Sequence, residues 1–146
     1  MIRSLRHFGI VVRDLEQAIN FYSGVLGLRV VRRMEEAGPF LDTILNKPGV
    51  RVSTVKLGAF KGPTLLELLY FTTPKAASSP CPSLFRSGLS HFALTVENLA
   101  LLHRNLLEKE TKILSAPSRS PDGLALVCFA RDPEGNLIEL VEELKS

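Results

Sequence analysis

The strongest constraint on the fold of this 146-residue chain is an internal repeat. The segment LRHFGIVVRDL at 5–15 aligns without gaps with LSHFALTVENL at 89–99, and both contain His-Phe and end on an acid or amide followed by Leu. A second pair of segments, TLLELLYF at 64–71 and NLIELVEE at 136–143, shares the pattern Leu-x-Glu-Leu. Such self-similarity indicates the duplication of one supersecondary unit. We therefore expect two halves with the same order of elements.

Each half reads as a strand, a helix and three further strands. The alternating residues after His7 and His91 predict the first strand, which ends before Asp14 or Asn98. Asp and Asn are good helix N-caps, and the apolar residues after them recur at helical spacing. The other strands are expected at 28–34, 50–57 and 64–71 in the first half and at 111–114, 123–130 and 136–143 in the second. The first half is longer between its His and its Glu, and the extra residues are expected in a loop at 35–49.

This order of elements predicts an α+β fold of tandem βαβββ modules. The first module covers 1–74, a stretch rich in Pro and Ser at 75–88 reads as a linker, and the second module covers 89–146. A chain of this length suits one hydrophobic core. We therefore expect 1–146 to be a single domain.

Glu67 is unusual because it stands in LLELLYF, where every other side chain is apolar or aromatic. In a strand, this stretch places apolar side chains on both faces, so both faces are expected to be buried. An ionised, unpaired carboxylate in such a place costs several kcal/mol or more, so it needs a compensating partner. Glu139 in NLIELVE repeats the same arrangement.

Two histidines and two glutamates stand at repeat-equivalent positions: His7, His91, Glu67 and Glu139. If the halves pack about a pseudo-twofold axis, each contributes one His and one Glu to a shared cleft. Two imidazoles and two carboxylates suit one divalent ion such as Zn, Ni, Co, Mn or Fe. One such residue alone is more often a core or surface residue, but the repeat places all four in register. The prediction is a curved mixed sheet around a metal cleft.

His103 has no repeat partner and is interpreted as a surface or packing residue.

Composition excludes several other classes of protein. The net charge is +3, and the basic residues are scattered rather than gathered in a stripe, so no nucleic-acid partner is expected. No apolar stretch is long enough to span a membrane, and the N-terminal residues do not read as a signal peptide, so a cytoplasmic protein is expected. Cys81 and Cys128 belong to no CxxC pair or His/Cys cluster and are expected to be free thiols.

At these residues the chain resembles the vicinal oxygen chelate superfamily, which includes glyoxalase I, methylmalonyl-CoA epimerase, extradiol dioxygenases and the fosfomycin and bleomycin resistance proteins. The stretch HFGIVVRDLEQAINFYSGVLGL at 7–28 is similar to the opening motif of that family, and DPEGNLIELVE at 132–142 is similar to its closing motif. The His-Glu-His-Glu order resembles that of bacterial glyoxalase I. Epimerases of the superfamily typically carry Gln where Glu67 stands and a second carboxylate before the third strand, where this chain has LNKPGVRV at 45–52.

The resemblance implies a metal-dependent, glyoxalase-like lyase or isomerase that acts on a small substrate. In that mechanism the ion binds neighbouring oxygens of the substrate, and a Glu abstracts a proton next to a carbonyl group. Glu139 is the first candidate for this base and Glu67 is the second. The chain departs from the glyoxalase I pattern at Phe8 and Ser90, beside the two histidines. The alternatives are a metal-dependent dioxygenase, a thiol transferase, or a non-catalytic protein that binds an antibiotic or another small molecule. The resemblance also implies a homodimer.

Overall fold

The computed structural model describes residues 1–78, 80 and 82–144, so Cys81 lies outside the described residues. The chain divides into two compact units, Met1–Ser79 and Pro80–Ser146, and each is treated separately below. Within the described part of the chain, no helix is long and apolar enough to cross a membrane.

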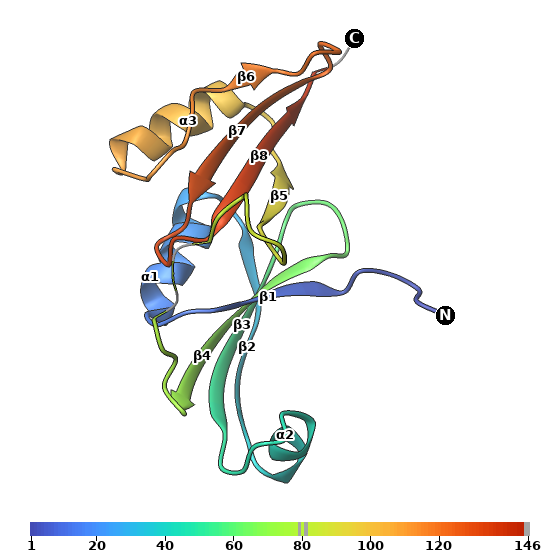
Figure 1. Ribbon diagram of the computed structural model, residues 1–146, viewed down its shortest axis with the longest axis vertical. Helices are drawn as coiled ribbons and strands as arrows, with labels where there is room; N and C mark the ends of the chain where they lie inside the picture. The colour runs from blue at the N-terminus through green and yellow to red at the C-terminus, as the bar shows by residue number, and fades with distance from the viewer. Residues whose placement is uncertain (79, 81, 145–146) are drawn as a thin grey trace. The chain divides into compact units, whose positions relative to one another are not determined.

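The first unit is built on a four-stranded sheet in the order β1-β4-β3-β2 (Figure 1). Its strands are β1 (His7–Val11), β2 (Arg29–Ala37), β3 (Arg51–Gly58) and β4 (Leu65–Thr73). β1 runs parallel to β4, and the other neighbours are antiparallel. The parallel pair needs a crossover, and α1 (Leu15–Ile19) with its π-helical continuation η1 (Asn20–Val25) follows β1. The N-cap was predicted from the sequence, and the Asp14 carboxylate accepts a hydrogen bond from Gln17 N at 2.9 Å.

One face of this sheet packs against the helical crossover. Leu66 and Leu68 of β4 share that face, and both are buried. α1 contacts β4, and Tyr22 in η1 is fully buried. On the other face of β4, Glu67 and its neighbours are only partly buried. The prediction that both faces of LLELLYF are buried is therefore too strong for the Glu67 face, where Leu69 and Phe71 are partly buried against a cluster formed by Leu41, Val50 and Val52.

The stretch 35–49 is not the loop that the sequence predicts. β2 continues to Ala37, and a short helix α2 (Pro39–Ile44) follows at the end of the first sheet (Figure 1). Both oxygens of Asp42 accept hydrogen bonds, from the N–H groups of Gly49 and Val50 at 2.9 Å each, and these bonds hold the return to β3. The extra residues of the first half thus form an ordered cap on the sheet.

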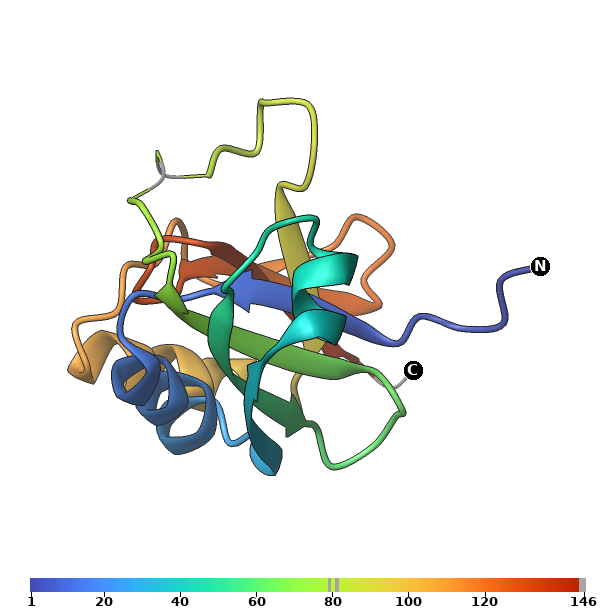
Figure 2. The same ribbon diagram turned by 90° about the horizontal axis from the view of Figure 1, so that it is seen from below.

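The second unit repeats the arrangement with a four-stranded sheet in the order β5-β8-β7-β6. Its elements are β5 (His91–Thr95), α3 (Leu99–Glu108), β6 (Ser118–Arg119), β7 (Ala125–Arg131) and β8 (Leu137–Glu143). β5 runs parallel to β8, and Figure 2 shows the sheet from a second direction. The Asn98 side chain caps α3 as predicted, by accepting from Leu101 N at 2.9 Å. The strand predicted at 111–114 is reduced to a single bridge from Ile113, and the two-residue β6 pairs with β7 instead.

The two sheets have equivalent registers at the residues that repeat. Gly9 of β1 stands opposite Glu67 of β4, and Ala93 of β5 stands opposite Glu139 of β8. Each unit contains a strand, a helix and three further strands around a mixed sheet. The predicted α+β fold of tandem βαβββ modules is confirmed.

Removing bulk from the centre of β4 should destabilise the fold. Leu68 is fully buried, so Leu68→Ala leaves a cavity and should lower the free energy of unfolding by about 2–5 kcal/mol. Leu5→Ala is the matched control, because that leucine is 70% exposed, and it should change stability by less than about 0.5 kcal/mol. Urea unfolding followed by circular dichroism measures both variants. Equal losses would contradict this account of the core.

Candidate functional site

The first half-site consists of His7, Glu67 and Lys56, which all lie in the first unit. β1 and β4 are parallel, and His7 stands two residues before Gly9, the residue opposite Glu67. His7 therefore lies on the same face of the sheet as Glu67, and its Nε2 is 3.2 Å from Glu67 Oε2. The Glu67 side chain is 12% exposed. The structure thus brings together the His and the Glu that the sequence predicts in the first half.

Lys56 is a member of this half-site that the sequence prediction missed. It stands directly opposite Glu67 in the antiparallel pair β3–β4, and its Nζ is 3.4 Å from Glu67 Oε1. Each oxygen of the carboxylate therefore has a nitrogen beside it. The Lys56 ammonium group therefore compensates part of the negative charge of Glu67. The contact follows from the register of the hairpin, in which Lys56 and Glu67 are each two residues from the Gly58–Leu65 pair, and the alternation of residues in the sequence does not reveal that register.

The second half-site consists of His91, Glu139, Ser90 and Phe129, all in the second unit. His91 Nε2 is 3.3 Å from Glu139 Oε2, which repeats the geometry of the first pair. Ser90 Oγ lies 2.8 Å from His91 Nδ1 and so orients the ring with Nε2 toward Glu139. Phe129 stands opposite Glu139 and packs its ring against His91 edge to face, with the centroids 5.2 Å apart. The Glu139 side chain is 26% exposed, more than that of Glu67.

The donor atoms of both half-sites fit a divalent metal ion. Two ligands bonded to one such ion at about 2.0–2.2 Å lie about 3 Å apart. The Nε2-to-Oε2 distances of 3.2 Å and 3.3 Å are close to that value without any rearrangement. Within the described residues, no group of three or more His, Cys, Asp and Glu side chains is gathered. The structure therefore brings the four predicted ligands together as two pairs.

Two other residues singled out in the sequence lie away from these pairs. His103 is on α3 and is half-buried. Cys128 is a free thiol on β7, where it stands opposite Leu140, and it is fully buried. Burial raises the pKa of the Cys128 thiol, because the thiolate would lose its hydration. This cysteine is therefore a poor nucleophile and behaves as a core residue.

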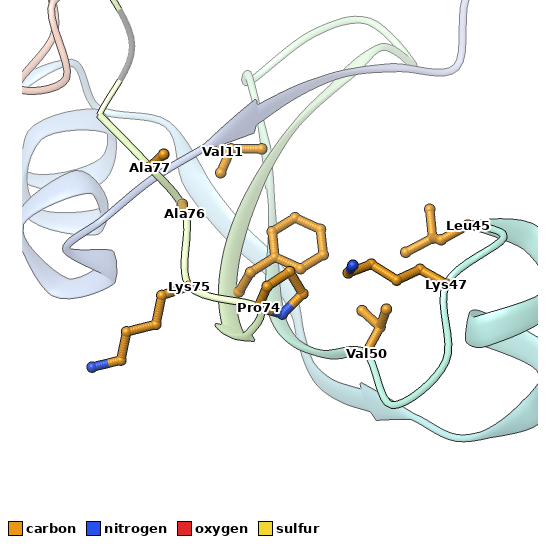
Figure 3. Close-up of a pocket in the computed structure, with 9 residues that line it drawn as sticks. Val11, Leu45, Lys47, Val50, Pro74, Lys75, Ala76 and Ala77 are labelled. Atoms are coloured by element: carbon orange, nitrogen blue, oxygen red, sulfur yellow. The ribbon is translucent and has the colours of Figure 1, made fainter.

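A cavity of about 350 Å³ lies in the first unit, on the side of the sheet that carries the first half-site. Val11 lies on the same face of β1 as His7, and Phe71 lies on the same face of β4 as Glu67, since side chains alternate along a strand. The walls are mainly apolar, and Figure 3 shows Lys47 pointing into the cavity. The Glu67 face of the first sheet thus combines a polar cluster with an apolar hollow farther along the same strands.

A family model described as Glyoxalase/Bleomycin resistance protein/Dioxygenase superfamily matches residues 4–140. The chain belongs to this superfamily. It is 26% identical over 140 residues to a probable lactoylglutathione lyase of Synechocystis, covering 94% of each chain. It is 33% identical over 119 residues to a mitochondrial methylmalonyl-CoA epimerase of Bos taurus, covering 79% of this chain and 59% of that relative's length. A glyoxalase family protein from Bacillus cereus has the same fold, with a TM-score of 0.88 at 23% identity, covering 99% of this chain and 97% of that one.

Loss of the two glutamate charges should have unequal effects on stability in the presence of a chelator. Glu67→Gln leaves Lys56 without its carboxylate in a partly buried place, so it should lower the free energy of unfolding by about 1–2 kcal/mol. Glu139→Gln removes a more exposed carboxylate that stands opposite Phe129 rather than a cation, so the loss should stay below about 1 kcal/mol. Urea unfolding at pH 7.5 compares them. Equal losses would show that Lys56 is no real partner of Glu67.

Proposed function

We propose that this protein is a divalent-metal-dependent, glyoxalase-like lyase or isomerase of the lactoylglutathione-lyase type. It would move a proton next to a carbonyl group of a small substrate. The observation that carries the proposal is the pair of His–Glu contacts at repeat-equivalent places, with donor atoms 3.2 Å and 3.3 Å apart. One such contact is an ordinary ion pair or hydrogen bond. The repetition of the same geometry in both units favours one common function for the two contacts.

The proposed metal ligands are His7, Glu67, His91 and Glu139. Zn, Ni, Co, Mn and Fe all accept a mixed set of imidazole nitrogens and carboxylate oxygens. When bound, such an ion polarises a carbonyl oxygen and stabilises the negative charge that develops on it. The chain orients its own donors, since Ser90 holds the His91 ring by its other nitrogen. Contacts of this kind fix ring orientation and tautomer in metal centres.

Glu139 is the proposed general base, and Glu67 is the second candidate. Glu139 would accept a proton from the carbon next to the carbonyl group and return it to the neighbouring carbon. Phe129, directly opposite on β7, packs on His91 and places no charge beside the Glu139 carboxylate. Glu67, in contrast, already has a nitrogen beside each of its oxygens, His7 Nε2 at 3.2 Å and Lys56 Nζ at 3.4 Å, and it is therefore the second candidate.

The Glu139→Gln variant tests the assigned base. It keeps the shape of the side chain but removes the proton acceptor, so kcat/KM should fall by about 10²–10⁴-fold while the melting temperature changes little. The assay uses methylglyoxal with each of several thiols, including glutathione. Glu134→Gln, in the turn before β8, is the matched control and should keep its activity. Near-normal turnover of Glu139→Gln would rule out the role assigned to it.

The Ser90→Ala variant tests the metal centre without reference to catalysis. Loss of the hydroxyl that holds His91 should weaken the binding of Zn²⁺ or Ni²⁺ by about 10–100-fold, because the ring is no longer oriented. Titration against a competing chelator measures this affinity, and elemental analysis of the purified protein identifies the resident ion. Ser87→Ala, an exposed serine nearby in sequence, is the control. Unchanged affinity in Ser90→Ala would contradict the assignment of His91 as a ligand.

A methylmalonyl-CoA-type epimerase is the second candidate function, and the 33% identity to the bovine epimerase favours it. The residues argue the other way. Glu67 occupies the place where the epimerases of the superfamily typically have Gln, and 45–52 contains no acid. Asp42, the acid that precedes this stretch, is bound to the backbone at Gly49 and Val50. Epimerisation of methylmalonyl-CoA, assayed beside the methylglyoxal reaction, separates the two functions.

The proposed setting is a cytoplasmic homodimer with a small-molecule substrate. The two half-sites would meet either within one chain or across two chains, and the proposed chemistry is the same in both cases. Sedimentation of the wild-type protein with and without the ion measures the oligomeric state. Mixing Glu67→Gln chains with Glu139→Gln chains then distinguishes the two cases, because activity would return only where half-sites are shared between chains.

A further inference from the structure

The two half-sites match in His and Glu but differ in the residue opposite the glutamate. Lys56 stands opposite Glu67, whereas Phe129 stands opposite Glu139. The two residues occupy the same register position on the third strand of each unit. The duplication thus preserves the donor atoms, but it places a cation beside one carboxylate and an aromatic ring beside the other.

Lys56 contacts Glu67 directly, and its side chain is only partly exposed. Its Nζ is 3.4 Å from Glu67 Oε1, while Oε2 faces His7 Nε2 at 3.2 Å. The Lys56 side chain is 23% exposed, so the ammonium is partly withdrawn from water beside a carboxylate that is withdrawn further. Charges in such places are screened less than charges at the surface. The ammonium therefore balances much of the charge of Glu67 before any ion binds.

A divalent ion that binds Glu67 meets this ammonium at short range. Both positive charges are attracted to one carboxylate, and they repel each other. In the second unit the corresponding residue, Phe129, is uncharged and packs on His91. In the first half-site the Lys56 ammonium therefore repels a bound cation. The second half-site has no such positive charge opposite its glutamate.

We propose that Lys56 is a resident counter-cation of Glu67, which competes with the metal ion for this carboxylate. In the metal-free protein it neutralises the charge of Glu67, and in the metal-bound protein it lowers the affinity of the whole site for the ion. Lys56 is thus a positioning residue that tunes retention of the metal. The inference rests on the proposed function in one respect, namely that Glu67 is a metal ligand.

Metal titration of Lys56→Met tests the inference. The variant should bind Zn²⁺ or Ni²⁺ at least about tenfold more tightly than the wild type, which is the effect of one unit charge on a divalent ion a few ångström away even in bulk water. Its melting temperature without metal should fall by about 4 °C or more, and saturating ion should restore it. Lys56→Arg, which keeps the charge, should bind the ion like the wild type. A purely structural lysine would lower the melting temperature in both conditions without tightening metal binding.

Two further variants make the comparison sharper. Phe129→Lys introduces the same charge at the equivalent register position of the second unit and should weaken ion binding by about tenfold. Lys61→Met removes a charge from an exposed position of the first unit and should leave affinity unchanged. Equal or weaker ion binding by Lys56→Met would overturn the inference alone and leave the metal centre intact. Absence of ion binding in the wild type and in Lys56→Met alike would overturn the metal centre, and the inference with it.

Discussion

Pairing between an imidazole and a partly buried carboxylate at the centre of each sheet is the interaction on which the candidate site depends. Glu67 and Glu139 stand on strands whose other residues are mostly apolar, so each needs a partner on the same face. The parallel pairing of β1 with β4, and of β5 with β8, supplies it by placing a His on that face. Parallel neighbours need a crossover. The helices that begin after Asp14 and Asn98 follow from this requirement.

The duplication preserves this requirement but leaves the surroundings free to differ. In the first unit, β2 and β3 are long, α2 caps the end of the sheet, and Lys56 approaches Glu67. In the second unit, β6 has two residues, and Phe129 packs on His91. The two glutamates thus have the same imidazole partner in different electrostatic surroundings. Equivalent positions do not require equivalent roles, and the different roles proposed for the two carboxylates rest on this difference.

The features that were predicted correctly have signals that can be read directly from the sequence. Helix caps depend on residues three positions apart. The arrangement of His and Glu in each unit follows a repeat that is visible in the letters alone. The misses depend on contacts that span the chain. The stretch 35–49 reads as a loop, yet it is ordered by Asp42, whose carboxylate binds the backbone seven and eight residues later. Lys56 was missed because its partner is set by the register of a hairpin, and alternation along one strand does not reveal that register.

The chain is similar both to lactoylglutathione lyases and to a methylmalonyl-CoA epimerase, and the proposed assignment to the lyase type rests on Glu67. Both proposed reactions need a carboxylate that takes a proton next to a carbonyl group. Further selection of the substrate would come from residues that touch the rest of it. In the first unit, Leu45, Lys47 and Val50 line the cavity on the Glu67 side of the sheet. They belong to the stretch around α2, which has no counterpart helix among the described residues of the second unit. Under the proposed function, the part of the chain that departs from the repeat is therefore the part best placed to select a substrate, and the repeated part would supply the chemistry.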